Sequence, residues 1–241
     1  MSNSKHSSIT MVMIFVMSTL LIGYTPPVAQ GASVVITDAV QIVDGGAVNE
    51  RMASMTSDSE GNIHVVWSRN TQHLYYSMLD PRAQTVIDVT QISNGGGHRA
   101  WHPDIDIDSD DRIHIVWANK ASQHEILYTL LDPSLDDQDG STADDSTISI
   151  IDDTEVTRRQ QNRDWPAIAV DSQNNAHIVW EDSYDRHDKY FQQPQIYYKF
   201  LEIDEASREA ITAIDSTLLT PIIGHKGHPD IAIDADDLVQ I

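Results

Sequence analysis

The sequence repeats one pattern three times in full and then begins it a fourth time. In each full copy an aspartate opens a short polar turn, an apolar run ending in tryptophan follows, and a tyrosine-containing run comes next. The turn aspartates are Asp58, Asp108, Asp171 and Asp234, and the tryptophans are Trp67, Trp117 and Trp180. A repeat of about 50 to 63 residues made of short strand-like runs predicts a propeller or a solenoid array.

Each full copy divides into four strand-like runs separated by turn residues. In the first copy these are residues 54–58, 63–67, 73–79 and 86–92. In the second they are 104–108, 113–117, 125–131 and a run within 147–157. In the third they are 167–171, 176–180, 195–201 and a run within 210–220. Four short antiparallel strands per repeat are typical of a β-propeller blade.

We therefore predict an all-β propeller at residues 33–241. Its three complete blades lie at about 51–93, 102–157 and 165–220, and a partial blade lies at 228–241. Propellers typically need about 4–8 blades to close a ring. The chain is accordingly interpreted as the N-terminal part of a longer propeller, with an open array or an assembly of several chains as alternatives. Residues 34–43 resemble an isolated outer strand of a blade.

The N-terminus has the pattern of an export signal. Lys5 and His6 precede an apolar run at residues 11–22, which is too short for a comfortable membrane span. Small residues favour cleavage after Gly31 or Ala32. Residues 1–32 are therefore predicted to be a signal peptide, leaving a secreted or cell-surface protein with no membrane span after cleavage. An uncleaved N-terminal anchor is the alternative.

Charge and cysteine content exclude several classes of function. The chain has 37 acidic and 15 basic residues, a formal net charge of -22. Such a surface repels phosphate backbones, so we expect no nucleic-acid partner. The absence of cysteine excludes disulfides, thiolate metal sites and a cysteine nucleophile.

The repeat carries the pattern Pro-x-Ile-Ala-Ile-Asp, then His-Ile-Val-Trp, then Ile-Tyr-Tyr. In this pattern it resembles the blades of sialidase-like (BNR-type) propeller proteins, which bacteria and archaea export. The Phe-Arg-Ile-Pro motif that carries the first sialidase arginine is absent. The family's Asp box lies between the third and fourth strands of a blade, whereas the turn aspartates here lie between the first and second. The resemblance therefore implies a fold and assigns no catalytic residue.

In the sialidase-like family, ligands meet the face made by the loops that enter each blade and the loops between its second and third strands. In this chain those loops carry basic and aromatic side chains, which suit an acidic or sugar ligand. Exposed loops that simply carry polar residues are the alternative. We expect Arg99 and Arg163 to be exposed there and to contribute little stability. The candidate ligand-binding residues are Arg99, Trp101, His102, Arg163, Trp165, His228, Glu181 and Asp182.

Asp104, Asp106 and Asp108 form the densest group of carboxylates. Alternation along a strand would place all three on one face. Ca²⁺ binds six to eight oxygens, so a calcium site is one interpretation of this group. Turn carboxylates that are simply solvated are the other. No further cofactor is predicted.

His64, His114 and His177 recur at one strand position, which predicts a structural role for them. We expect a ring nitrogen of each to bond a neighbouring strand or turn, and we expect the three tryptophans to be buried at equivalent positions. The leading function is a binding or scaffold propeller for a glycan or a protein partner. The alternative is a sialidase-like glycoside hydrolase whose remaining catalytic residues lie beyond this chain, because a propeller fold alone cannot decide.

Overall fold

The computed structural model describes residues 39–43, 48–93, 99–121, 124–136, 148–157, 162–183, 194–204, 206–207, 209–220 and 227–241. All of them belong to one compact unit, Ala39–Ile241. The predicted signal peptide, residues 1–32, lies outside these ranges. Within these ranges, no helix is long enough and apolar enough to cross a membrane.

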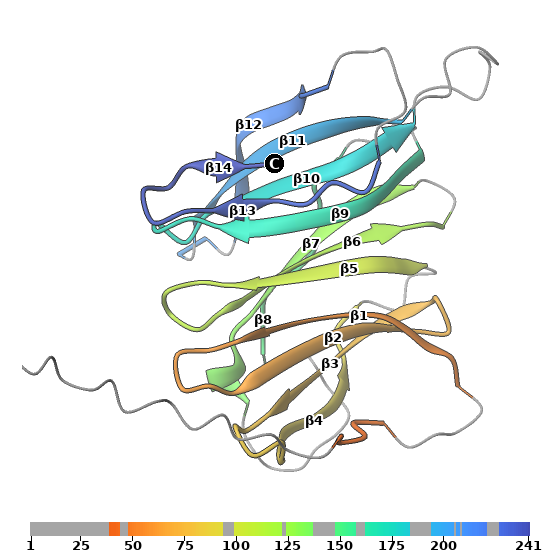
Figure 1. The fold of residues 1–241 in the computed structure, drawn as a ribbon, viewed down its shortest axis with the longest axis vertical. Coiled ribbons are helices and arrows are strands. Elements are labelled where there is room, and N and C mark those ends of the chain that lie inside the picture. Colours follow the sequence, from red (N-terminus) through yellow and green to blue (C-terminus); the bar gives the residue numbers. More distant parts are fainter. Residues whose placement is uncertain are drawn as a thin grey trace, which may run out of the picture. The chain divides into compact units, whose positions relative to one another are not determined.

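The described strands form four antiparallel sheets in which neighbours in sequence are neighbours in space (Figure 1). Blade 1 contains β1 (Glu50–Ser57), β2 (Ile63–Arg69), β3 (His73–Leu79) and β4 (Thr85–Gln91). Blade 2 contains β5 (Ala100–Ile107), β6 (Ile113–Asn119), β7 (Glu125–Leu131) and β8 (Ser149–Glu155). Blade 3 contains β9 (Asn162–Val170), β10 (Ala176–Ser183), β11 (Gln195–Asp204) and β12 (Glu209–Leu218). Blade 4 contains β13 (Ala232–Ile233) and β14 (Val239–Gln240).

The first strands of the sheets, β1, β5, β9 and β13, lie side by side in that order, and the later strands of each sheet lead away from them (Figure 1). This is the arrangement of propeller blades, with the first strand of each blade innermost. The prediction of an all-β propeller with three complete blades and a partial fourth is confirmed.

The inner strands begin four or five residues earlier than predicted. Met52, His102, Trp165 and His228 have φ angles of 55, 47, 49 and 55°. In blades 1 to 3 the strand register shifts at this point, which marks a β-bulge. In blades 2 and 3 a proline follows the bulged residue and cannot donate to the ladder, so the bulge lets the strand continue past it. The sequence prediction began each strand only after this point.

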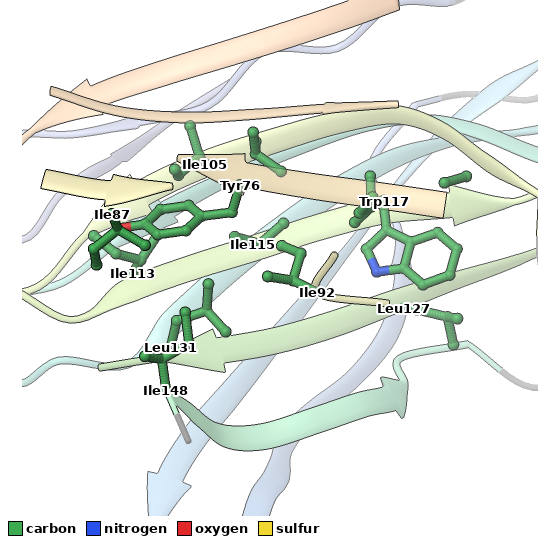
Figure 2. Close-up of a cluster of buried hydrophobic side chains, with 13 residues drawn as sticks. Tyr76, Ile87, Ile92, Ile105, Ile113, Ile115, Trp117, Leu127, Leu131 and Ile148 are labelled. Atoms are coloured by element: carbon green, nitrogen blue, oxygen red, sulfur yellow. The ribbon is translucent and has the colours of Figure 1, made fainter. Parts of the chain in front are cut away.

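The core lies between successive blades. Ile87 and Ile92 at the outer edge of blade 1 pack with Ile105, Ile113 and other apolar side chains of blade 2 (Figure 2). The three repeat tryptophans occupy the same register position on the second strand of each blade and are buried, as predicted: Trp67, Trp117 and Trp180. Burial of apolar area between blades, rather than any disulfide, stabilises the array.

One face of blade 3 is only partly covered. Ile87, Ile151 and Ile214 occupy the same position on the fourth strands of blades 1, 2 and 3. The first two are 5 % and 3 % exposed because the next blade covers them, whereas Ile214 is 46 % exposed. Blade 4 contributes only two short strands, which leaves the outer part of this face open.

Each full blade contains a linked aspartate, histidine and tyrosine. In blade 1, His64 Nε2 lies 3.3 Å from Asp58 Oδ2, and His64 Nδ1 lies 2.8 Å from the Tyr76 hydroxyl. The same pairs recur at 3.2 and 2.9 Å in blade 2 and at 3.2 and 2.8 Å in blade 3. The histidine thus ties the turn before it to the strand after it, and its predicted structural role is confirmed. The members in blades 2 and 3 are Asp108, His114, Tyr128, Asp171, His177 and Tyr198.

The pKa of His64 gives a pH-dependent contribution to stability. Burial lowers this pKa below its ordinary value of 6.5, and the neighbouring Asp58 carboxylate opposes the shift only partly. Below pH 6.5 the unfolded chain therefore binds a proton that the folded chain resists, so folding stability falls as pH falls.

We expect the free energy of unfolding of the wild-type protein to fall more steeply below pH 6.5 than that of a His64→Gln variant. The difference in slope can reach about 1.4 kcal/mol per pH unit, the value for one proton. Urea unfolding between pH 7.5 and 5 measures it. Parallel curves for the two proteins would contradict the assignment.

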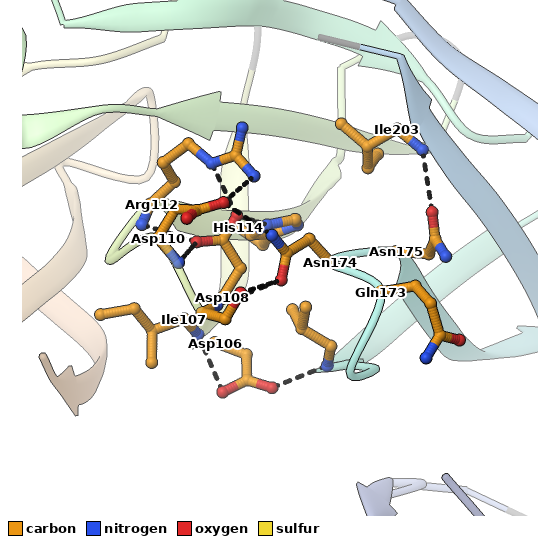
Figure 3. Close-up of polar contacts among 12 residues, drawn as sticks. Asp106, Ile107, Asp108, Asp110, Arg112, His114, Gln173, Asn174, Asn175 and Ile203 are labelled. Atoms are coloured by element: carbon orange, nitrogen blue, oxygen red, sulfur yellow. Dashed lines mark hydrogen bonds and ion pairs between the residues drawn. The ribbon is translucent and has the colours of Figure 1, made fainter. Parts of the chain in front are cut away.

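The turns between the first and second strands are linked from blade to blade, and we call this series the turn ladder. In each link a serine N–H and hydroxyl donate to a side-chain oxygen of the next turn. The accepting residues have positive φ. The links run from Ser59 to Asp111, from Ser109 to Asn174 and from Ser172 to Asp237. Figure 3 shows Asn174 beside the Asp108 turn.

Candidate functional site

Four residues with positive φ form a row across the blades, which we call the bulge column. Three lie at the bulges of β1, β5 and β9, and the fourth lies at the matching position before β13. His102 stacks on Trp165 with ring centroids 3.6 Å apart, and Trp165 meets His228 at 4.0 Å. The backbone N–H of His102 donates to Met52 Sδ at 3.3 Å. The column contains one residue from each blade because all four have positive φ at the same position of the repeat. Its members are Met52, His102, Trp165 and His228.

A carboxylate fixes the middle of the bulge column. Asp164 Oδ1 lies 2.6 Å from His102 Nδ1, and Asp164 Oδ2 accepts a hydrogen bond from Lys120 Nζ. Burial raises the pKa of Asp164, but the bonds and charges of His102 and Lys120 outweigh burial, so the pKa lies below its ordinary value. Asp164 is therefore ionised at neutral pH, and it links blade 3 to two side chains of blade 2.

A second ion pair joins β9 and β10. Arg163 Nε donates to Asp182 Oδ2 at 3.1 Å, and both side chains are buried. Burial raises the pKa of Asp182 despite the neighbouring Arg163 charge. Glu181, the neighbour of Asp182 in sequence, accepts the backbone N–H of His228 at 3.3 Å. This carboxylate reaches the last member of the column from blade 3.

The structure brings most of the predicted site residues together but corrects the expected role of Arg163. This residue is buried and ion-paired, whereas the sequence analysis expected an exposed side chain of little importance to stability. Arg99 is exposed as expected, and its backbone N–H donates to Asn119 Oδ1. The two arginines do not occupy equivalent positions, since the strand registers align Arg163 with Ala100.

Trp101 lies beside the column, edge-on to His102, and the Lys120 ammonium sits 5.5 Å from its ring centre. Sequence reasoning missed Met52 and Asp164. The repeat itself could have pointed to Asp164. It lies two residues before the proline of blade 3, and the equivalent position in blade 2 holds Trp101, which was a predicted site residue. Met52 carries no such signal, because alanine replaces the proline in blade 1.

Asp104 and Asp106 have a structural use that the calcium interpretation did not anticipate. Asp104 accepts hydrogen bonds from Ser54 Oγ of blade 1 and from the Ile168 N–H of blade 3, at 2.9 and 3.0 Å. Asp106 accepts the Val170 N–H of blade 3 at 2.8 Å. Burial raises the pKa of both carboxyls, with the backbone bonds opposing it. The two aspartates thus join inner strands that belong to different sheets.

Asp108 does not join them, because its side chain turns into the hairpin and bonds Arg112 and His114 (Figure 3). The predicted common face of the three carboxylates is therefore wrong for Asp108. Within the described part of the chain, no three histidine, cysteine, aspartate or glutamate side chains are arranged to hold a metal ion. The structure consequently gives the calcium interpretation of Asp104, Asp106 and Asp108 no support.

Comparison with known proteins gives only distant likenesses. No protein-family model and no curated protein matches the sequence. Among solved structures, similarity extends to a thermostable family-43 glycoside hydrolase, with 12% identity, a TM-score of 0.44, and 73% of this chain and 54% of that chain covered. An endo-arabinase from Bacteroides thetaiotaomicron gives 12% identity and a TM-score of 0.44, with 78% of this chain and 67% of that chain covered.

An α-L-arabinanase from Cellvibrio cellulosa, solved in complex with arabinohexaose, gives 9% identity and a TM-score of 0.43, with 77% of this chain and 65% of that chain covered. The chain thus spans between about half and two thirds of these structures. Likenesses at this level do not bear on the activity of this chain.

Proposed function

We propose that the bulge column and its surrounding polar groups bind a neutral oligosaccharide. The observation that carries this proposal is the column itself, a rigid row of aromatic and apolar side chains bordered by fixed hydrogen-bonding groups. Pockets that hold sugars and similar ligands combine apolar surface with a few well-placed polar groups. Trp165 is 36 % exposed. The exposed part is the edge of the ring, because the rings of His102 and His228 lie against its two faces.

The charge state of the site favours a neutral ligand over an anionic one. Lys120 is paired with Asp164, and Arg163 is paired with Asp182. At the same end of blade 1, Arg69 is paired with Glu50 at 2.6 Å. Cations already neutralised by carboxylates offer little net attraction to an anion. Hydroxyl groups, in contrast, can both donate to carboxylates and accept from ammonium and imidazole groups.

Replacing Trp165 by alanine is expected to weaken oligosaccharide binding at least about tenfold, equal to about 1.4 kcal/mol. The reason is that the change leaves His102 and His228 without the ring that holds them in a row. Binding of neutral oligosaccharides, first screened on a glycan array, is measured by titration calorimetry. Glu60→Ala, in an exposed turn outside the column, is the matched control. Equal affinity in wild type and Trp165→Ala would refute the site.

A glycoside hydrolase is the second candidate. Glu181 and Asp164 are direct cross-strand partners, so their carboxyl groups lie close together. Asp164 is ionised because, although burial raises its pKa, His102 and Lys120 lower it by more. Glycoside hydrolysis needs two carboxyl groups in different environments. The test is whether the protein releases reducing ends from an oligosaccharide. Release by the wild type that is abolished in Asp164→Asn would assign hydrolysis instead of binding alone.

We place this function outside the cytoplasm, on the sequence evidence for an export signal at residues 1–32. An exported protein can meet oligosaccharides at the cell surface. N-terminal sequencing of the exported protein tests the signal, and an intact Met1 there would oppose its cleavage.

A further inference from the structure

The imidazole of His102 has one nitrogen in use and one free. Its Nδ1 lies 2.6 Å from Asp164 Oδ1, whereas its Nε2 has no hydrogen-bond or ion-pair partner among the described residues. The side chain is 14 % exposed. Nε2 is not one of the buried, unpartnered side-chain atoms in the described part of the chain, so it is open to solvent.

Neighbouring side chains hold the His102 ring in one orientation. Trp165 covers one face, with the two ring planes 15° apart, and Trp101 meets the ring edge-on at 68°. Asp164 is itself held by Lys120, which donates to its Oδ2. A ring packed in this way resists the rotation that would exchange its two nitrogens.

The charge of Asp164 decides which nitrogen of His102 carries the proton. Burial raises the pKa of Asp164, but the bonds and charges of His102 and Lys120 together lower it below its ordinary value, so the group is a carboxylate at neutral pH. A carboxylate only accepts hydrogen bonds, and a neutral imidazole has one N–H and one lone pair. The hydrogen bond of one ring nitrogen sets the state of the other. In the neutral ring Nδ1 therefore carries the proton and Nε2 keeps the lone pair.

We propose that His102 Nε2 is a hydrogen-bond acceptor of the bulge column and that it recognises a hydroxyl group of the ligand. This assignment rests on the proposed oligosaccharide binding and adds which ligand group is recognised there. A ligand along the exposed edge of Trp165 reaches the neighbouring edge of His102, because the two rings stack with centroids 3.6 Å apart. Asp164 is a positioning residue, since it acts through His102.

A lone pair at this place selects among ligands. A hydroxyl group donates to it, whereas a carboxylate or an ether oxygen offers only a second lone pair. A site that hydrogen-bonds a ligand hydroxyl rejects analogues that lack it, because its own polar group is then left without a partner. The ligand is therefore expected to present a free hydroxyl to His102, and not a uronate or an O-methyl group.

The position of the proton can be measured without any ligand. Long-range ¹H–¹⁵N correlation spectra of the ¹⁵N-labelled protein at about pH 8 show which ring nitrogen is protonated, because an ordinary histidine is mostly neutral there. We expect His102 to carry its proton on Nδ1. His228, whose ring has no hydrogen bond among the described residues, is the internal reference and should carry its proton on Nε2, as free histidine prefers. A wild-type His102 protonated on Nε2 would overturn the proposal.

Removing the carboxylate tests the positioning role of Asp164. Asp164→Ala should move the proton of His102 from Nδ1 to Nε2. Glu181→Ala is the matched control, because Glu181 is the cross-strand neighbour of Asp164 and should leave the tautomer of His102 unchanged. A proton that stays on Nδ1 in Asp164→Ala would overturn the role of Asp164. The wild-type spectrum decides the matter by itself if Asp164→Ala does not fold.

The ligand hydroxyl is tested with the neutral oligosaccharide that binds best on a glycan array. His102→Phe keeps a ring against Trp165 but removes Nε2, so titration calorimetry should show binding weakened about tenfold, the loss of one well-placed hydrogen bond. Equal affinity in His102→Phe would overturn the acceptor role, even where Trp165→Ala shows that the column is the site. An array on which no oligosaccharide binds would refute the proposed function and the hydroxyl assignment together, whereas the tautomer is established without a ligand.

Discussion

Replacing Asp108 by alanine is expected to lower the free energy of unfolding by about 3–5 kcal/mol, the cost of breaking a buried ion pair from one side. Asp108 Oδ1 accepts the backbone N–H groups of Asp110 and Arg112, both at 2.9 Å. Its Oδ2 accepts Arg112 Nε at 2.7 Å and lies 3.2 Å from His114 Nε2. One carboxylate thus serves the turn, a buried guanidinium and a buried imidazole.

The pKa of Asp108 is consistent with this role. Burial raises it, but the bonds from His114 and the Arg112 backbone outweigh burial, so the pKa lies below its ordinary value. Its stabilising contribution is present above pH 3.8 and is lost as pH falls through the lower folded value.

Urea unfolding at pH 7 measures the Asp108→Ala effect. Glu60→Ala provides the control, because Glu60 is an exposed residue in the equivalent turn of blade 1. It is expected to change stability by less than about 0.5 kcal/mol. Asp58→Ala should lower the free energy of unfolding by an intermediate amount. In blade 1 Asn62 takes the place of Arg112, and a neutral side chain that loses its partner costs less than a buried guanidinium that does so. A loss for Asp108→Ala no larger than that for Glu60→Ala would contradict the interpretation.

Replacing Arg163 by alanine is expected to lower the free energy of unfolding by about 3 kcal/mol at pH 7. The change leaves the buried Asp182 carboxylate without the guanidinium at 3.1 Å. Burial already raises the pKa of Asp182, and loss of the Arg163 charge raises it further.

The sign of the pH dependence follows from that raised pKa. A carboxyl whose folded pKa exceeds its unfolded value of 3.8 favours the folded state below that value and disfavours it as pH rises through the folded value. The loss in Arg163→Ala should therefore be largest at neutral pH and shrink toward pH 4. Thermal unfolding across that range measures the trend.

Two further variants isolate the pair. Arg99→Ala removes an exposed arginine from the same end of the blades and should change stability by less than about 0.5 kcal/mol. Adding Asp182→Asn to Arg163→Ala should recover part of the loss, because it removes the uncompensated charge. No recovery, together with a pH-independent loss, would show that Arg163 acts by packing alone.

The sequence predicted those parts of the fold that depend on local chemistry repeated in every blade. The strand at Glu125–Leu131 was predicted residue for residue, because Asp132-Pro133 ends it and apolar residues fill it. The structural histidines were predicted because recurrence at one position, in each of several blades, favours a contact within the blade over a shared ligand.

The parts that were missed depend on contacts between strands that lie apart in the sequence, within one blade or between two. Nothing near Arg163 in the sequence indicates its pairing with Asp182 on the neighbouring strand, so it was taken for a loop residue. Asp104 and Asp106 belong to the densest group of carboxylates, which suggested a cation site. Their partners in the structure are instead a serine hydroxyl and backbone N–H groups of other blades. The bulge column required knowing that inner strands lie side by side and continue past their prolines, which local propensity opposes.

Because of the turn ladder, a middle blade has the same kind of hydrogen-bonded link to the blade before it and to the blade after it. The turn of each middle blade contains a serine that donates hydrogen bonds and a residue that accepts them. A duplicated blade placed between two others would therefore form links on both sides without further change. Gly61 takes the receiving position in the first turn, and Ala235 the giving position in the fourth. These two residues lack the side chain that a link would use. A copy of blade 2 or blade 3 would therefore carry both the donating and the accepting side chain of the link.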